Sequence, residues 1–317
     1  MRCPVTATDP RVLDIAIVGV GKIARDQHIP AIAGHPGLRL AATASRSGGV
    51  EGVENFASLD ELMAARPEIP AVSLCMPPQV RYDIARAAIM AGKHVMLEKP
   101  PGASVAEVLD LKALAEAQGV TLFATWHSRH AAGVAAAKAW LAGRRILRAH
   151  IDWKEDVRHW HPGQDWIWEP GGLGVFDPGI NALSILTEIL PAPVHLTAAE
   201  LTFPENRAQP IAADLRFAGA DGLAVTAAFD WRQTGPQTWD IAVETGDGRL
   251  VLSEGGAKLA LDGQPLETTG SGEYPDLYRR FAELIPAGDI DVDVAPLIHV
   301  ADAFLMGRRL TTDAFHD

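Results

Sequence analysis

A glycine-rich turn between a strand-like and a helix-like segment is the feature that most constrains this fold. The apolar run Leu13–Val18 predicts a buried strand, G-V-G-K-I-A follows it, and a helix is expected over Lys22–Ala33. In this spacing Gly19 permits a tight turn, Gly21 lets the backbone approach a pyrophosphate, and Ala24 lets helix and strand pack closely. The N–H groups at the helix start then face the anion. The segment predicts a dinucleotide site, and the alternative is a glycine turn in an ordinary strand–helix unit.

Short apolar runs alternate with helix-like segments through the first 125 residues or so. Further strands are expected over Leu38–Ala44, Val72–Cys75, His94–Leu97 and Thr121–Ala124, with helices over Leu59–Ala65, Val80–Ala91 and Val105–Gln118. Buried strands that alternate with helices predict a parallel sheet covered on both faces.

The second half of the chain has a different pattern. Strands are expected over Arg148–Trp153, Leu196–Thr202, Ile211–Phe217, Leu223–Trp231, Trp239–Glu244, Leu250–Ser253 and Lys258–Leu261. Helices near Val134–Leu141, Ile180–Leu190, Tyr274–Ile285 and Ala295–Met306 are expected to complete this part. Strands joined by Asp-Gly turns predict an open, mostly antiparallel sheet. The fold class is therefore α/β, with a dinucleotide-binding domain over 1–127 and a substrate-binding and oligomerisation domain over 128–317.

Composition excludes several classes of function. The 28 Lys and Arg against 40 Asp and Glu give a formal net charge of −12, which disfavours nucleic acid and anionic membrane as partners. Cys3 and Cys75 are too few for a disulfide framework or a cysteine zinc site. No stretch reaches the roughly 18 apolar residues of a membrane span, and Met1 to Asp14 lack the apolar core of a signal peptide. We expect a cytoplasmic protein.

The end of the second strand bears on cofactor choice. A carboxylate at this point would accept the ribose 2′-OH of NAD, but the residues here are Ser45 and Arg46. A hydroxyl and a guanidinium favour a 2′-phosphate instead. We therefore expect NADP to be preferred and NAD to be tolerated; the alternative is that Arg46 only stacks on adenine.

The segment Glu98-Lys99-Pro100-Pro101 follows a predicted strand. Ligands of open α/β sheets bind outside the carboxyl ends of the strands, and two prolines restrain the turn that carries Lys99. Lys99 is thus a candidate site residue, and a solvated surface lysine is the alternative.

A second motif runs from Gly171 to Asn181. Its glycines predict a close-approach loop, and Pro178 suits the first turn of a helix. Asp177 and Asn181 are four residues apart, so both can project from one helical face. Asp177 is a candidate for catalysis and equally a candidate helix N-cap.

The segment Trp153–Trp168 holds four of the chain's eight tryptophans, together with Glu155, His159 and His161. Flat apolar rings beside hydrogen-bonding groups suit a sugar, and an aromatic core cluster is the alternative. No carboxylate motif of known spacing accompanies the histidines, so no metal site is expected.

Three segments together, Gly19–Ala24, Glu98–Pro100 and Gly171–Asn181, resemble the Gfo/Idh/MocA oxidoreductase family over essentially the whole chain. The resemblance implies a Rossmann domain followed by an α/β domain whose open sheet forms an oligomer interface, here expected in a dimer. Segments 21–28, 125–129 and 153–158 resemble the subgroup of bacterial L-arabinose and D-galactose 1-dehydrogenases. One departure from the wider family is Asn181, where inositol dehydrogenases have a histidine; because Asn cannot titrate, an Asp–His relay at this spacing is not available.

The resemblance implies oxidation of a small neutral sugar at C1 to the aldonolactone, with hydride transfer to the nicotinamide. Asp177 is expected as the general base and Lys99 as its electrostatic partner, with the reverse assignment open. The expected sugar-binding residues are Asn181, Glu155, His161, His127 and Trp160. The expected cofactor-binding residues are Gly19, Gly21, Lys22, Ile23, Ala24, Ser45, Arg46, Pro77, Glu98 and Lys99. The rival functions are dehydrogenation of another sugar or an inositol, and a non-enzymatic sensor of nucleotide and sugar.

Overall fold

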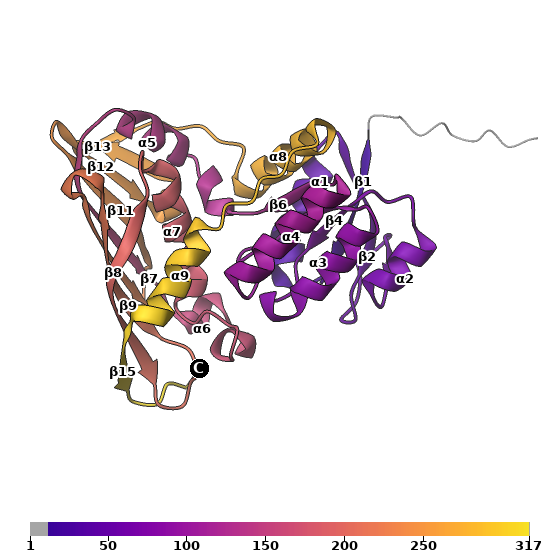
Figure 1. The fold of residues 1–317 in the computed structure, drawn as a ribbon, viewed down its shortest axis with the longest axis horizontal. Coiled ribbons are helices and arrows are strands. Elements are labelled where there is room, and N and C mark those ends of the chain that lie inside the picture. Colours follow the sequence, from indigo (N-terminus) through magenta and orange to yellow (C-terminus); the bar gives the residue numbers. More distant parts are fainter. Residues whose placement is uncertain (1–11, 317) are drawn as a thin grey trace, which may run out of the picture. The chain divides into compact units, whose positions relative to one another are not determined.

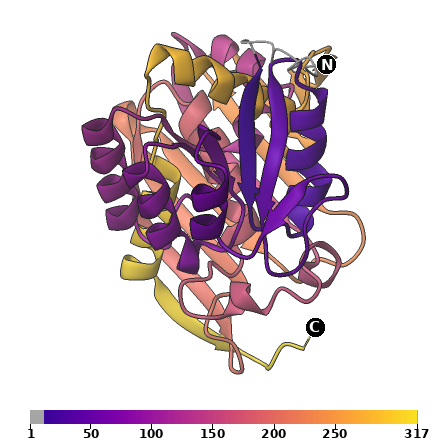
Figure 2. The same cartoon turned by 90° about the vertical axis from the view of Figure 1, so that its right-hand side faces the viewer.

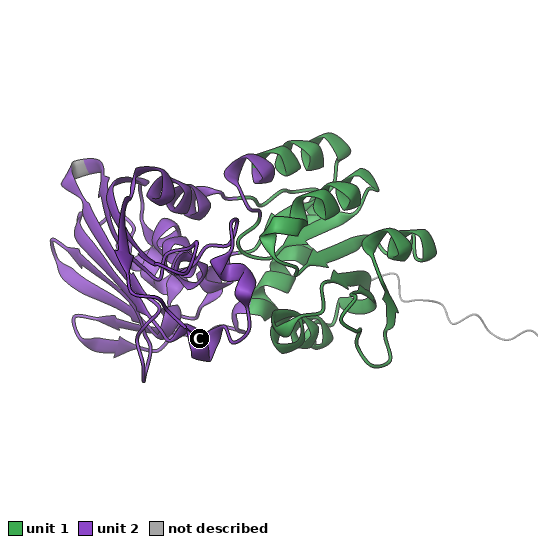
Figure 3. Cartoon of the chain, turned by 90° about the horizontal axis from the view of Figure 1, so that it is seen from below, with its two compact units in different colours: residues 1–101, 109–125, 274–292 green, residues 102–108, 126–273, 293–317 purple. Residues whose placement is uncertain are grey.

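The computed structural model describes residues 12–316 of the chain (Figure 1). Cys3 and the N-terminal segment 1–11 lie outside the described residues. The chain groups into two compact units (Figure 3): unit 1 holds residues 1–101, 109–125 and 274–292, and unit 2 holds 102–108, 126–273 and 293–317. The expected domain boundary after residue 127 stays a prediction.

Unit 1 contains a six-stranded sheet in which every strand pair is parallel. Its strands are β1 Leu13–Val18, β2 Leu38–Ala44, β3 Glu54–Phe56, β4 Ala71–Leu74, β5 His94–Leu97 and β6 Leu122–Ala124. Their order is β3-β2-β1-β4-β5-β6. This order confirms the predicted parallel Rossmann sheet, and its switch point, where ligands bind, lies between β1 and β4.

Helices cover both faces of this sheet (Figures 1 and 2). Side chains alternate along β1, so Ala16 and Val18 share a core with α2, α3 and α4, whereas Ile15 and Ile17 share another with α1 and α8. The bounds are η1 Ala24–His28, α1 Ile29–Gly34, α2 Leu59–Ala65, η2 Pro78–Val80, α3 Arg81–Met90, α4 Val105–Gln118 and α8 Glu273–Ala287. The helix near Tyr274–Ile285 was expected to complete the second-half sheet, and this grouping was wrong. The helix, α8, lies in unit 1, where its apolar face packs in one core with β1.

Unit 2 contains a nine-stranded sheet of order β14-β13-β12-β11-β7-β10-β9-β8-β15. Only β10–β7 and β15–β8 pair in parallel; the other pairs are antiparallel, as expected. The strands are β7 Ile146–Lys154, β8 Val194–Pro204, β9 Ala212–Gly219, β10 Ala224–Asp230, β11 Thr238–Thr245, β12 Gly248–Ser253, β13 Lys258–Leu261, β14 Gln264–Leu266 and β15 Arg308–Thr312.

The helices α5, α7 and α9 pack on one face of this sheet, against residues such as Ile151 and Ile241. The opposite face carries exposed polar side chains, including His150, Arg216 and Thr226. The helices of this unit are η3 His127–His130, α5 Val134–Leu141, α6 Val157–Trp160, η4 Asp165–Trp168, α7 Phe176–Ile189, η5 Ala220–Gly222, η6 Glu254–Gly256 and α9 Ala295–Met306. Within residues 12–316, no helix combines the length and apolar character needed to cross a bilayer.

The packing of α8 yields a test of unit 1. Phe281 is fully buried and its ring stacks on Phe123 with centroids 6.3 Å apart. We expect Phe281→Ala to lower the free energy of unfolding by about 3–5 kcal/mol in urea titrations, because the cavity cannot refill. The exposed Leu109 on α4 is the control, and Leu109→Ala should change this energy by less than about 0.5 kcal/mol. Equal losses in both variants would contradict the packing of α8 on the sheet.

Candidate active site

The turn after β1 has the shape that a dinucleotide pyrophosphate needs. Gly19 has φ +88°, and a Cβ there would lie 2.9 Å from the backbone nitrogen of Met76, so only glycine fits. Within residues 12–316, no part of the chain beyond the turn itself lies within 4 Å of a Cβ placed at Gly21, which leaves open space beside the backbone. Ala24 is fully buried against the sheet. The three residues thus fit the roles predicted from their spacing.

The remaining residues predicted at the cofactor differ in their surroundings. Ser45 is buried directly after β2, and its hydroxyl lies 3.1 Å from that of Ser47. Arg46 is exposed. Lys22 is exposed too and forms an ion pair with Asp26 one helical turn later.

Two apolar residues also belong to the predicted cofactor set. Ile23 is half-buried and packs on the core that α1 shares with the sheet, and Pro77 is half-buried just after β4. The backbone carbonyl of Pro77 accepts a hydrogen bond from the N–H of Val80, which starts the short helix η2.

Glu98 is a buried carboxylate that holds the turn carrying Lys99. Its Oε1 accepts a hydrogen bond of 2.7 Å from the Tyr274 hydroxyl and lies 3.1 Å from Nε2 of His28. Its Oε2 accepts the backbone N–H of Lys99 at 2.6 Å. The Lys99 side chain is half-buried, and the Lys99–Pro100 peptide is cis. The carboxylate therefore fixes the backbone of the residue next to it.

His28 extends the buried hydrogen-bond network of Glu98. Its Nδ1 lies 2.7 Å from the Tyr278 hydroxyl, which lies 2.9 Å from the Ser73 hydroxyl. Burial opposes a charge on His28, but attraction to Cys75 and Tyr278 and hydrogen bonds to Cys75 and Glu98 outweigh it, so the pKa of His28 is raised well above 6.5. This imidazole faces the Glu98 carboxylate, with Nε2 3.1 Å from Oε1.

Arg81 at the start of α3 fixes the same turn from the other side. It is buried and donates hydrogen bonds to the backbone carbonyls of Met76, Glu98 and Pro100. Burial lowers the pKa of Arg81 to about 10, so the side chain stays cationic at neutral pH. One cation therefore ties the loop after β4 to the loop after β5.

In unit 2, Asp177 lies in the first turn of α7 and is buried. The N-cap position belongs to Val175, so the structure does not support a capping role for Asp177. The preceding loop packs tightly, since a Cβ at Gly172 would lie 2.4 Å from the carbonyl oxygen of Trp166. Asn181 follows Asp177 by one helical turn and is half-buried.

The structure brings Asp177 together with His161 and Glu155. His161 Nδ1 lies 3.7 Å from Asp177 Oδ2, and His161 Nε2 lies 3.4 Å from Glu155 Oε1. Glu155 is buried and also accepts hydrogen bonds from two indole N–H groups, of Trp231 at 3.3 Å and Trp239 at 2.8 Å. The sequence patterns did not predict these two tryptophans as site residues.

Trp160 and His127 have other neighbours. The Trp160 ring on α6 is 37% exposed and packs on Trp239, with centroids 5.0 Å apart. His127 Nδ1 lies 2.8 Å from Glu273 Oε2; burial disfavours the Glu273 carboxylate, yet the nearby His127 lowers its pKa overall. Among residues 12–316, no group of three or more His, Cys, Asp or Glu side chains is arranged to hold a metal ion.

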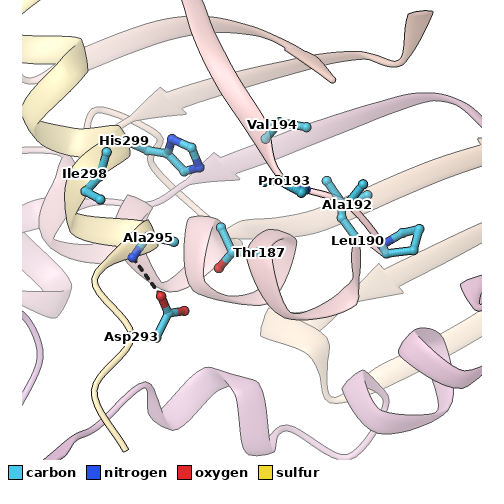
Figure 4. A pocket seen from close by; sticks show the side chains of 10 residues that line it. Thr187, Leu190, Ala192, Pro193, Val194, Asp293, Ala295, Ile298 and His299 are labelled. Atoms are coloured by element: carbon cyan, nitrogen blue, oxygen red, sulfur yellow. Dashed lines mark hydrogen bonds between the residues drawn. The ribbon is translucent and has the colours of Figure 1, made fainter. Parts of the chain in front are cut away.

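A separate cavity of about 450 Å³ in unit 2 is lined by residues of α7, α9 and the loop between α7 and β8 (Figure 4). His299 lines it, and burial lowers the pKa of this histidine. Asp293 at its edge accepts the backbone N–H of Ala295 at 2.8 Å. The predicted site residues do not contribute to its walls, so we separate this cavity from the candidate active site.

The contacts of Arg81 predict that this side chain stabilises the folded protein, because it holds the turn that carries Lys99. We expect Arg81→Met to lower the free energy of unfolding by at least about 3 kcal/mol, because three buried carbonyls lose a charged donor. Urea titration measures the loss. Arg86→Met removes an exposed arginine from the same helix and should cost less than about 0.5 kcal/mol. Similar losses in the two variants would refute this role of Arg81.

Comparison with known proteins places the chain in a family. A model of an oxidoreductase family with an NAD-binding Rossmann fold, Gfo/Idh/MocA, matches residues 13–125. Galactose 1-dehydrogenase of Pseudomonas fluorescens is 45% identical over 96% of this chain and 98% of its own length. The crystal structure of a D-galactose 1-dehydrogenase from Rhizobium etli is 62% identical, covers 98% of this chain and 99% of that one, and has a TM-score of 0.93.

A more distant structure shares the fold alone. It is a 3-ketoreductase of Actinomadura kijaniata in a complex with NADP, 18% identical, with a TM-score of 0.82 over 95% of this chain and 99% of its own. Because the relatives above match over nearly their whole length and the family model matches the sheet of unit 1, this chain belongs to the Gfo/Idh/MocA oxidoreductase family.

Proposed function

We propose that this protein is an NAD(P)-dependent aldose 1-dehydrogenase that oxidises D-galactose, L-arabinose or both at C1 to the aldonolactone. The similarity to galactose 1-dehydrogenases over almost the whole chain supports this substrate class. L-arabinose has the same configuration at the ring carbons that it shares with D-galactose and lacks only the hydroxymethyl group, so one pocket can accept both.

The observation that carries the proposal is the cluster of Glu155, His161 and Asp177 beside tryptophan rings. Carboxylates and an imidazole bind sugar hydroxyls, while indole faces contact the C–H surface. Asn181 adds an amide on the helix that carries Asp177, and Trp160 adds a partly exposed ring. His127 is proposed as a more distant contributor through its pair with Glu273.

Proton transfer from the C1 hydroxyl is assigned to Asp177, a buried carboxylate on a helix. Lys99 is proposed as the cation that stabilises negative charge on the developing alkoxide. The opposite assignment, with a neutral Lys99 as base, makes a different prediction, because Asp177→Asn would then retain near wild-type kcat.

The cofactor is proposed to bind at the turn after β1, with NADP preferred and NAD tolerated. Gly19, Gly21 and Ala24 fit a pyrophosphate. Arg46 is exposed shortly after β2, where its guanidinium is proposed to bind the 2′-phosphate. When bound, the nicotinamide supplies the acceptor for the hydride of C1.

The partner of each subunit is proposed to be a second copy, docked through the nine-stranded sheet of unit 2. Helices cover one face of this sheet, while the other presents small and charged side chains in register across β7, β10 and β11. We also propose that the enzyme works in the cytoplasm, as its cysteine content suggests.

A panel of sugars tests the function. We expect D-galactose or L-arabinose to give the highest kcat/KM with NADP⁺, measured by absorbance of the reduced cofactor, and D-glucose and inositol to be slower. The preference between the first two should stay within about 10- to 200-fold, the range that small differences in pocket packing supply. Faster turnover of inositol would overturn the substrate assignment, and sugar binding without turnover would favour a sensor.

The cofactor preference has its own test. We expect Arg46→Ala to lower kcat/KM for NADP⁺ by at least about tenfold and to leave NAD⁺ use within about threefold, because only NADP carries the phosphate that the guanidinium binds. Arg39→Ala removes an exposed arginine from the opposite end of β2 and serves as the control. Unchanged use of NADP⁺ by Arg46→Ala would rule out the phosphate role.

A further inference from the structure

His161 lies between two buried carboxylates that come from different elements. Glu155 follows β7 and faces its Nε2 at 3.4 Å, and Asp177 on α7 faces its Nδ1 at 3.7 Å. The side chains of Glu155 and Asp177 are 4% and 5% exposed. Gln164 Oε1 also lies 3.4 Å from Nδ1, and the Trp231 ring packs on the imidazole with centroids 5.3 Å apart.

We propose that His161 acts behind Asp177 as the acceptor of the proton that leaves the sugar. This inference rests on the proposed oxidation of an aldose at C1. Asn181 cannot hold a proton, so α7 itself lacks a titratable partner one turn after Asp177. The structure places an imidazole at Asp177 from the segment that follows α6 instead.

The proposed relay needs a neutral His161 that carries its proton on Nε2, and the surroundings of Glu155 suit this tautomer. Each carboxylate oxygen of Glu155 accepts an indole N–H, from Trp231 at Oε1 and from Trp239 at Oε2. Both donors are neutral, and His161 Nε2 lies 3.4 Å from Oε1 of the same carboxylate, where an N–H on Nε2 can donate to it. The neutral imidazole then carries its proton on Nε2 and leaves Nδ1 as an acceptor on the Asp177 side.

The longer contact on the other side of the ring agrees with this tautomer. A lone pair on Nδ1 cannot bond an ionised Asp177, and 3.7 Å exceeds a hydrogen-bond distance. Gln164 Oε1 lies 3.4 Å from the same nitrogen, and the relay requires this amide to turn its N–H toward Nδ1 instead. Once Asp177 is protonated it becomes a donor, and Nδ1 can accept its proton.

Asp177 and His161 together account for the proton that the sugar loses. The C1 hydrogen leaves as hydride to the nicotinamide, while the O–H bond of the C1 hydroxyl breaks and its proton passes to Asp177. From Asp177 the proton moves to His161 Nδ1, which restores the aspartate carboxylate and forms an imidazolium. That cation lies between the carboxylates of Glu155 and Asp177, which stabilise it.

The pH dependence of turnover tests the relay in the full-length enzyme with saturating D-galactose and NADP⁺. Protonation of His161 before the reaction blocks Nδ1, so wild-type kcat should fall at acid pH. We expect His161→Gln to lower kcat at neutral pH at least about tenfold and to abolish this acid limb, with KM for NADP⁺ unchanged. His195→Gln, at an exposed histidine of β8, should keep the wild-type rate and profile.

Two further variants separate the relay from a structural role. Glu155→Gln should shift the acid limb to lower pH, because the imidazolium loses a stabilising charge; this result stands even where His161→Gln unfolds. Adding His161→Gln to Asp177→Asn should cost less than about twofold more, since both residues serve one proton path. An unshifted acid limb in Glu155→Gln, or fully multiplicative losses in the double variant, would overturn the relay. Absence of aldose turnover in the wild type would instead refute the proposed function.

Discussion

A carboxylate that leaves water must find hydrogen bonds inside the protein, and much of unit 1 depends on how Glu98 meets this requirement. Its partners are a hydroxyl from α8, an imidazole from the helix after β1 and the backbone N–H of the next residue. Removing any one of them leaves a buried negative charge short of a donor, which costs more than the bond contributes. The turn that carries Lys99 is therefore held in place, because two distant segments and the neighbouring backbone N–H converge on one side chain.

Glu155 in unit 2 meets the same requirement with a different result. Its donors are two indole N–H groups, which satisfy the oxygens without adding positive charge. Glu98, in contrast, faces His28, whose pKa is raised well above 6.5. Glu98 therefore holds the Lys99 turn together with a histidine of raised pKa, whereas Glu155 is held by neutral donors beside His161, the arrangement on which the proposed relay depends.

The parallel sheet was predictable because its signal is local. The bounds of β1, β2 and β5 agree with the apolar runs expected from the sequence. The short strand β3 and the polar strand β15, Arg308–Thr312, were not predicted, because pairing with a neighbour rather than apolar periodicity defines them. The helix α8 was expected, but its partner was not, since an amphipathic pattern shows that a face is buried and not against which sheet.

In the candidate site, too, the sequence could relate residues within one motif but not residues that come together from distant segments. Residues within one motif, such as Asp177 and Asn181, could be related by helical spacing, whereas Trp231, Trp239 and Tyr274 reach their carboxylates from strands and helices far along the chain. The abundance of tryptophan was a signal, but it pointed to segment 153–168 alone.

Asparagine rather than histidine at position 181 means that the proposed proton relay draws its imidazole from outside α7. A histidine on α7 would tie the proton acceptor to the helix that carries Asp177. With Asn181 there, the imidazole of the proposed relay comes from the segment after α6 and lies beside Glu155, which follows β7. All three groups of the proposed relay belong to unit 2, while the turn that fits the dinucleotide belongs to unit 1. The proposal thus assigns the two halves of the oxidation, removal of a proton and removal of a hydride, to groups on different compact units of one chain.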